Sequence, residues 1–546
     1  MISFRAIGRY ILNPRRLHDR WRIHQDLRRF RQTYGSLFSS PVHSGIDRRV
    51  LVVGLHGFIP SAKEDGIYAK ALEWHGYTPW ILVERGSIVS SHYKVYGLDR
   101  FVFFDDYVDL ISCAPLLRQA GEVVAGATRT AELLDFKYRD VHVGRHVLSL
   151  LMRHLHAGKL NLHDQLVARD LTKMLADAMR AVHAAEALLD EVKPEMLLFN
   201  ERGYTPFGEI FDVALNRKLN VIQYVASHRD DARIFKRYVR ETHDVHPHSL
   251  SDDSWKAISL LPWDERKERE LSEELYGHYA AGTWFNFQRL QHGKRIKSKD
   301  EVQAQLGLDP QKKTAVVFSH IFWDATFFYG DSLFDDYEEW LIQTVKAACA
   351  NAAVNWIVKL HPVNTWRLEA DGYTGELAER VALRNRIGAL PGHIHLIDPG
   401  TDINTYSLFG IADYGLTVRG TVGIEMAAFG IPVLTAGTGR YSGRGFTLDF
   451  RHPDEYLAAL GRIQEYPRLT AEQTVLAKKY AYGILKLRPL KLSTMKFEYS
   501  GAKDTFHPLN GSPKILARSL REMVEASDLS AFANWAVASP HLDYLA

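Results

Sequence analysis

Polar side chains of one chemical kind follow successive predicted strands in the C-terminal half of the chain. Serine, histidine, lysine, arginine and threonine bind phosphate, and acidic side chains accompany them. The candidate nucleotide-sugar-binding residues are Ser319, His320, Asp324, Lys359, His361, Pro362, Arg419, Gly420, Thr421, Gly423 and Glu425. Because ligands of open parallel sheets bind beyond the carboxyl ends of the strands, we expect these residues to face one ligand.

The segment 420–423 leads into a predicted helix over 422–429. The free N–H groups and the positive dipole end of a helix start attract an anion. Glu425 follows one turn later, where its carboxylate can accept both hydroxyls of a ribose. Taken singly, Thr421 can simply cap the helix and His361 can be an ordinary loop histidine. The joint placement of these residues after successive strands predicts a nucleotide site.

Two longer motifs carry a resemblance to a known family. Residues 359–362 (KLHP) and 419–434 (RGTVGIEMAAFGIPVL) look like the C-terminal half of GT-B glycosyltransferases. The continuation 435–447 (TAGTGRYSGRGFT) resembles the capsule polysaccharide biosynthesis proteins, the group containing the enzymes that place Kdo on lipid-linked capsule. In those proteins a G-F-E-A-L-x-x-G-x-P-V run precedes a tyrosine-and-glycine loop, and residues 423–433 and 441–447 match it here.

The resemblance covers residues 313–450 and implies roles for several of them. His361 would contact the donor phosphate, Pro362 would shape the loop and Lys359 would support the charge. The Kdo-transferring members carry a serine pair where this chain has Arg419-Gly420. A permanently charged arginine is a stronger phosphate ligand, so the donor stays open between CMP-, UDP- and GDP-linked sugars. No cofactor is expected beyond this nucleotide-sugar co-substrate.

The N-terminal half is then expected to hold the acceptor and the general base. An inverting transfer needs a carboxylate or imidazole within hydrogen-bond reach of the acceptor hydroxyl. Glu201, directly after a strongly apolar strand, is the preferred catalytic base, and His228 at the next strand end is the second catalytic candidate. His56 and Arg229 are the acceptor-binding candidates. An ion pair of Glu201 with Arg202 or Arg229 is the structural alternative.

We expect no metal site. Phosphate ligands already stabilise the leaving group by preorganised charge, so this chemistry requires no divalent ion. The segment 243–248 (HDVHPH) matches no zinc spacing and is expected to be a surface loop. Cys113 and Cys349 form no C-x-x-C motif, which argues against zinc ribbons and iron–sulfur clusters and favours a reducing compartment. The chain also lacks a P-loop, a dinucleotide fingerprint and a G-x-S-x-G elbow.

Two α/β units are needed to position these residues. Apolar runs alternate with helical patterns, which predicts mostly parallel sheets. The predicted strands are 49–55, 78–83, 100–104, 195–199, 220–225, 313–318, 355–360, 393–397, 412–418 and 433–435. The predicted fold class is α/β and GT-B-like, with two Rossmann-type domains facing a central cleft and helical additions. The predicted parts are a basic helical arm (1–44), an acceptor domain with a helical insert (45–305), a donor domain (306–465) and a helical extension (466–546).

Composition sets broad limits on the class of protein. The chain has 546 residues, of which 46% are apolar and 24% charged, and its net charge is +3. This near balance argues against a nucleic-acid binder. Residues 1–31 nevertheless carry nine arginines against Asp19 and Asp26, so this arm is at +7. Apolar residues at mostly helical spacing interrupt the arm: Leu17, Trp21, Ile23, Leu27 and Phe30.

Such a helix either lies on an anionic membrane or docks by its apolar side onto the protein. We expect no transmembrane helix and no signal peptide, and a cytoplasmic protein that is peripheral at the inner membrane if the arm binds lipid. The predicted activity is transfer of a sugar from a nucleotide sugar to a capsule or other cell-surface polysaccharide, lipid-linked or polymeric. The alternatives are a nucleotide-sugar epimerase or polyol-phosphate transferase on the same fold, or a non-catalytic polysaccharide export factor.

Overall fold

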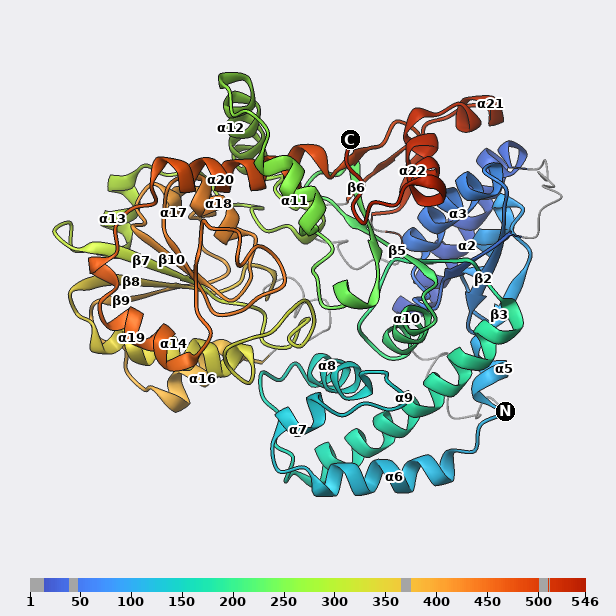
Figure 1. The fold of residues 1–546 in the computed structure, drawn as a ribbon, viewed down its shortest axis with the longest axis horizontal. Coiled ribbons are helices and arrows are strands. Elements are labelled where there is room, and N and C mark those ends of the chain that lie inside the picture. The colour runs from blue at the N-terminus through green and yellow to red at the C-terminus, as the bar shows by residue number, and fades with distance from the viewer. Residues whose placement is uncertain (1–13, 39–47, 365–374, 500–508, 510) are drawn as a thin grey trace.

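The computed structural model describes residues 14–38, 48–364, 375–499, 509 and 511–546, which form two α/β domains with helical additions (Figure 1). The N-terminal sheet has the strand order β13-β6-β5-β4-β1-β2-β3. Its strands are β1 (Arg48–Val53), β2 (Tyr77–Val83), β3 (Phe101–Phe103), β4 (Met196–Phe199), β5 (Asn220–Ala226), β6 (Ala232–Tyr238) and β13 (Leu490–Lys491). The strands β1 to β5 pair in parallel, whereas β6 pairs antiparallel with β5 and β13 pairs antiparallel with β6.

Helices cover both faces of this sheet, which is why its central strands are apolar on both sides. Val50 and Val52 of β1 share a core with α3 (Ile59–Trp74) and α22 (Ser527–Ala538). Leu51 and Val53 face the other way, toward α9 (Gln165–Val192) and α10 (Phe207–Asn216). The predicted helical insert is present and includes α6 (Cys113–Gly126), α8 (Val143–Leu155) and α9.

The C-terminal sheet is parallel throughout, with the order β12-β11-β10-β7-β8-β9. Its strands are β7 (Lys313–Phe318), β8 (Val354–Lys359), β9 (Ile394–Ile397), β10 (Tyr414–Thr417), β11 (Val433–Thr435) and β12 (Leu448–Asp449). This is the doubly wound order, in which the chain reverses direction across the sheet between β7 and β10. Ligands bind beyond the strand ends at that switch point. The predicted class of two Rossmann-type domains is confirmed.

The domain boundaries differ from those predicted. The helices α11 (Asp252–Ser259), α12 (Glu265–Ala280) and α13 (Lys299–Leu306) bury Ile258, Leu271 and Val302 in one core with β7 and β8, so the first domain ends near residue 250 rather than 305. The C-terminal segment is not one extension. After α20 (Ala471–Tyr482) packs on α18 (Val422–Ala428), the chain returns to the first domain and supplies β13 and α22 (Figure 1).

The basic arm is docked onto the first domain where the structure describes it. On α2 (Pro14–Tyr34), Ile23 and Phe30 are buried, and Asp26 forms an ion pair with the buried Lys63 of α3 at 2.8 Å. Trp21 is instead 58% exposed. Residues 1–13 of the arm lie outside the described residues, and within the described ones no helix is both long and apolar enough to span a membrane.

Candidate functional site

A cavity of about 400 Å³ lies at the switch point of the C-terminal sheet, between the two domains. Its floor is built by the carboxyl ends of β7, β8 and β10 and by the start of α18. Its remaining walls come from residues 225–226 and 246–248 of the first domain and from residues 284–291. Ten of the predicted nucleotide-sugar residues line it: Ser319, His320, Asp324, Lys359, His361, Pro362, Arg419, Gly420, Thr421 and Glu425.

The loop after β8 is held by hydrogen bonds to its backbone. The Ser319 hydroxyl accepts a hydrogen bond from the His361 N–H at 3.0 Å. The Val363 N–H donates to Nδ1 of His361 at 3.3 Å. In the neutral ring the proton is then on Nε2, as an N–H donor. Ser319 therefore positions the loop, and His361 offers a donor nitrogen at the cavity wall.

His320 connects the two strands that flank the switch point. Its Nε2 accepts a hydrogen bond from the Val418 N–H at 3.1 Å and lies 3.1 Å from the Thr417 hydroxyl. Burial and the neighbouring Arg419 hold the pKa of His320 well below its usual range. The ring is therefore neutral, and it fixes the turn after β10 rather than supplying positive charge.

The predicted role of Arg419 as a direct phosphate ligand needs correction. Its guanidinium donates to the carbonyls of Phe328 and Gly330 at 2.6 and 2.8 Å, and to that of Asp331 at 2.9 Å. Both terminal nitrogens are thus engaged with one loop, and the side chain is only 5% exposed. Arg419 positions the wall formed by that loop.

Lys359 presents an ammonium group at the cavity. The side chain is 4% exposed, and among the described residues no carboxylate forms an ion pair with its ammonium. Burial, and then the nearby Lys294, lower the pKa of Lys359 to about 7. Removing an ammonium from water without a partner is costly, so an anionic ligand at this place would relieve that cost.

Arg440 is a second such cation, which the sequence analysis missed. Its guanidinium donates to Nε2 of His246 at 2.6 Å and to the Arg419 carbonyl at 3.3 Å, and within the described ranges no carboxylate pairs with it. Burial lowers its pKa to about 10, and burial with Arg440 alongside keeps the pKa of His246 well below its usual range. The only signal in the sequence was its place inside the TGRYSGRGF segment.

Glu425 lies at the base of the cavity with one carboxylate oxygen available. The Tyr279 hydroxyl donates to Oε2, whereas Oε1 is buried and has no hydrogen-bond partner among the described residues. Burial raises the pKa of Glu425 to about 7. Gly423 does not line the cavity. A Cβ there would lie 2.0 Å from the Tyr441 hydroxyl, which donates to the Gly420 carbonyl at 2.8 Å, so Gly423 allows a close approach instead of binding a ligand.

Glu201 lies in a group of charged residues from both domains. Arg153 of α8 forms an ion pair with Asp324 at 3.4 Å, and the Tyr204 hydroxyl donates to the same carboxylate at 3.2 Å. Glu201 accepts a hydrogen bond from the Arg202 N–H at 2.8 Å, and burial raises its pKa against the lowering effect of Arg153. The expected side-chain ion pair is absent, because the Arg202 guanidinium donates to the His243 and Val245 carbonyls.

His228 and Arg229 are directed away from the cavity. Nε2 of His228 lies 2.8 Å from Oε1 of Glu274 on α12, and burial lowers the pKa of His228 to about 4. Arg229 pairs with Asp231 at 2.8 Å and with Glu274 at 3.3 Å. We therefore withdraw His228 as a catalytic candidate and Arg229 as an acceptor-binding candidate, because both side chains support the loop between β5 and β6.

His56 is half-buried at the end of β1, where its Nε2 lies 3.0 Å from Asp65. Asp65 also accepts hydrogen bonds from the hydroxyls of Tyr93 and Tyr224, at 2.7 and 2.6 Å. His56 does not line the large cavity. Its role in acceptor binding therefore stays a prediction, and the geometry ties the ring to Asp65.

The segment 243–248 is not the surface loop that we expected. His248 is buried, and both His246 and His248 line the cavity. His243 points the other way, with Nε2 at 2.7 Å from the buried Asp212. The burial of these histidines could not be predicted from the sequence, because their partners come from distant parts of the chain.

Three comparisons relate the chain to known proteins. No family model matches the chain, and no curated protein matches it by sequence. Among solved structures, KpsC beta Kdo 2,4 transferase of Thermosulfurimonas dismutans matches with 13% identity, over 61% of this chain and 87% of its own, at a TM-score of 0.33. UDP-GlcNAc 2-epimerase of Neisseria meningitidis matches with 11% identity, over 80% of this chain and 97% of its own, at a TM-score of 0.27. CalG4, the calicheamicin glycosyltransferase, matches with 15% identity, over 80% of this chain and 94% of its own, at a TM-score of 0.27.

The fold is GT-B-like. Its two sheets each belong to one domain, and the cavity lies between the two domains. What the protein binds must be argued from the cavity itself.

Proposed function

We propose that the protein is a glycosyltransferase that binds a nucleotide sugar in the interdomain cavity and transfers the sugar to a capsule or other cell-surface polysaccharide. The observation that carries the proposal is the pair of cations formed by the buried Lys359 and the half-buried Arg440. Both line one cavity, and neither has a carboxylate ion-pair partner among the described residues. A buried charge needs a partner, and the diphosphate of a nucleotide sugar supplies one.

The other groups of the cavity suit the remaining parts of such a donor. The N–H groups of Thr421 and Val422, at the start of α18, can add hydrogen bonds to the diphosphate. Oε1 of Glu425 lines the cavity and can accept a hydrogen bond from a ribose hydroxyl. His361 lines the same cavity and can contact the phosphate next to the sugar.

Catalysis would use Glu201 as the general base of an inverting transfer. Its carboxylate takes the proton of the acceptor hydroxyl while the acceptor oxygen bonds to the anomeric carbon. The bond from that carbon to the diphosphate breaks, and its electron pair leaves with the diphosphate, where Lys359 and Arg440 stabilise the charge. This scheme needs no metal ion. Support for Glu201 comes from its place after β4 and from the burial that raises its pKa.

The first experiment identifies the donor. Thermal unfolding is recorded with CMP, UDP and GDP compounds, because a ligand that binds only the folded state raises its apparent stability. We expect one nucleotide class to raise Tm in the wild type and to lose that effect in Lys359→Met, whereas Lys312→Met on the surface keeps it. No shift with any nucleotide in the wild type would refute the donor site.

The second experiment separates transfer from the alternatives. The donor that binds is incubated with and without a polysaccharide acceptor, and the sugar products are analysed. We expect sugar on the acceptor only when both are present. Conversion of the sugar with the donor alone would show an epimerase and refute the transferase. Binding of glycan without nucleotide binding would show an export factor.

The basic arm would bring the enzyme to a lipid-linked acceptor at an anionic membrane. Arg28, Arg29 and Arg31 are exposed on α2, while Ile23 and Phe30 are buried against the domain, so charge rather than an apolar face would make the contact. Arg28→Glu with Arg29→Glu should abolish binding to anionic liposomes and leave activity on a soluble acceptor unchanged. Equal liposome binding by wild type and variant would refute this role.

A further inference from the structure

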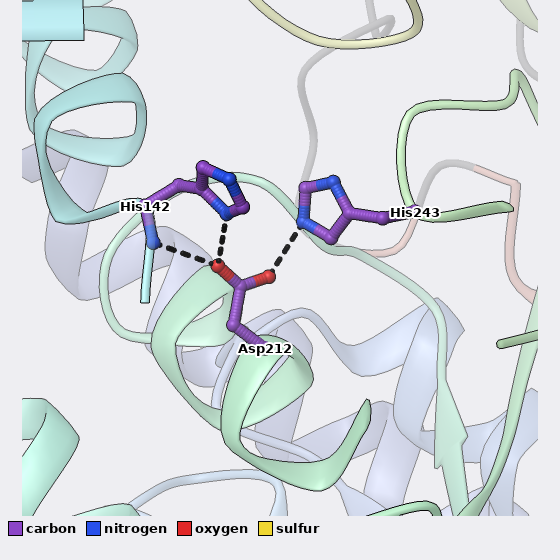
Figure 2. Close-up of side chains that lie close together, drawn as sticks. All are labelled: His142, Asp212 and His243. Carbon is purple, nitrogen blue, oxygen red and sulfur yellow. Dashed lines mark hydrogen bonds and ion pairs between the residues drawn. The ribbon is translucent and has the colours of Figure 1, made fainter. Parts of the chain in front are cut away.

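Three histidines from distant parts of the chain surround one buried aspartate, Asp212 of α10 (Figure 2). Nδ1 of His142 lies 3.2 Å from Oδ2, and Nε2 of His243 lies 2.7 Å from Oδ1. Nε2 of His146, which Figure 2 does not draw, lies 3.2 Å from Oδ2. Because His142 and His146 are four residues apart at the start of α8, they lie on the same side of that helix.

The geometry points to a site for a divalent transition-metal ion, with His142, Asp212 and His243 as ligands and Zn²⁺ as the ion that suits them. In a tetrahedral zinc site with bonds of about 2.0–2.1 Å, neighbouring ligand atoms are about 3.3 Å apart. The ring nitrogens here lie 2.7–3.2 Å from the carboxylate oxygens, and the facing atoms of His142, Asp212 and His243 all lie within 4.8 Å of one another. Movements of up to about 1.5 Å would bring the three side chains to that spacing.

The outer contacts of the histidines are those of metal ligands. A metal-bound histidine usually donates its other ring N–H to a carboxylate or a backbone carbonyl, which fixes the ring and its tautomer. Nδ1 of His243 lies 3.0 Å from Asp244, and Asp244 is held in turn by Arg145 at 2.9 Å. Nδ1 of His146 lies 3.2 Å from the Gly203 carbonyl. The rings of His146 and His243 are thus both held with Nε2 directed at Asp212.

A further buried acid stands beside this group. Glu209 lies one turn before Asp212 on α10, is 0% exposed, and has a buried Oε2 without a hydrogen-bond partner among the described residues. Burial raises its pKa, and His146 is the charge that most counters this rise. The set of nitrogen and carboxylate ligands excludes Ca²⁺ and Mg²⁺ as preferred ions, because those take oxygen ligands.

A second group of this kind does not offer a comparable site. His228, His278 and Glu274 also lie close together. However, the Glu274 carboxylate already pairs with Arg229 at 3.3 Å and with Lys486 at 3.0 Å, and these cations would repel a metal ion.

The ion would be structural, because none of its three ligands lines the donor cavity. It would tie α8 and α10 to the segment that begins at His243. Three residues later that segment reaches His246, which contacts Arg440. This inference does not depend on the proposed transferase activity.

The test measures zinc in the full-length protein without a histidine tag. After exposure to Zn²⁺ and dialysis, elemental analysis should find about one zinc per chain in the wild type, and chelation should lower Tm in a way that added Zn²⁺ reverses. His142→Ala and His243→Ala should each retain less than about a tenth of an equivalent. His163→Ala, which removes an exposed histidine elsewhere in the same domain, should bind like the wild type.

Two further variants keep the proposal testable if a ligand variant misfolds. Asp244→Asn should weaken zinc affinity by about 10–100-fold in a competition titration, since Asp244 only supports His243. His278→Ala should leave zinc binding unchanged. Absence of zinc from the wild type, equal zinc in the wild type and His142→Ala, or loss of zinc on His278→Ala alone would overturn the site.

Discussion

The pH dependence of nucleotide affinity provides the sharpest test of the donor site, because Lys359 and Glu425 respond to pH in opposite senses. In the free protein the pKa of Lys359 is lowered to about 7 and that of Glu425 is raised to about 7, in both cases chiefly by burial. A diphosphate at Lys359 favours its charged form and so binds best below pH 7. A ribose hydroxyl donating to Glu425 favours the ionised carboxylate and so binds best above pH 7.

The magnitude follows from the fraction of each group in its binding form. With a pKa of about 7, Lys359 is about 90% charged at pH 6 and about 10% charged at pH 8, so its contribution to affinity falls about tenfold, or about 1.4 kcal/mol. The contribution of Glu425 to affinity rises by the same factor from pH 6 to pH 8, because its carboxyl group becomes ionised. The product of the two gives the wild type a shallow optimum at pH 7, with affinity about threefold lower at pH 6 and at pH 8.

Single substitutions should separate the two effects. Glu425→Gln should leave only the lysine effect, so affinity should fall about tenfold from pH 6 to pH 8. Lys359→Met should leave only the carboxylate effect, so affinity should rise about tenfold over the same range. Lys359→Met also removes the charged hydrogen bond to the diphosphate, which should weaken nucleotide binding by about 1.5–3 kcal/mol at pH 6.

The assay is isothermal titration calorimetry with the nucleotide sugar selected by thermal shift, whose diphosphate stays ionised throughout this range. Titrations at pH 8 in buffers of different ionisation enthalpy should show proton uptake on binding in the wild type and none in Lys359→Met. Lys312→Met, on the surface of the same domain, should reproduce the wild-type profile. A Lys359→Met profile with the same slope as Glu425→Gln would refute the reasoning.

The remaining predictions concern single residues. Arg440→Met should weaken nucleotide binding by about 1.5–3 kcal/mol in calorimetry. Arg419→Met should chiefly speed amide exchange in the loop at 328–332, and a larger loss of affinity in Arg419→Met than in Arg440→Met would restore Arg419 as the phosphate ligand. Gly423→Ala should destabilise the fold by about 1–3 kcal/mol in urea unfolding, with part of the loss recovered by Tyr441→Phe, and full stability would contradict the close approach. Glu201→Gln should lower kcat by about 10²–10⁴-fold with nucleotide affinity unchanged, and wild-type kcat would exclude Glu201 as the base.

Much of the fold could be predicted from local pattern. The runs VLVV in β1 and MLLF in β4 are apolar at every position, as strands covered on both faces must be. The strand β7 was predicted with its exact bounds, and β4 within one residue. By contrast, β6 was missed, because ARIFKRY places charged residues on a buried antiparallel strand. Arg233 is buried there against Glu64 at 2.7 Å, a partner far away in the sequence.

Recognition of the strands was enough to predict ten of the residues that line the donor cavity. Parallel strands bring their carboxyl ends to one edge, so Ser319, Lys359 and Gly420 had to meet once their strands were recognised. What each side chain does there was decided only by tertiary structure. Arg419 is engaged by a loop, Arg440 pairs with no carboxylate in the described part of the chain, and His243 meets the distant Asp212 as well as its neighbour Asp244. The physical reason is that burial and pairing depend on contacts between segments distant in sequence, which local spacing does not encode.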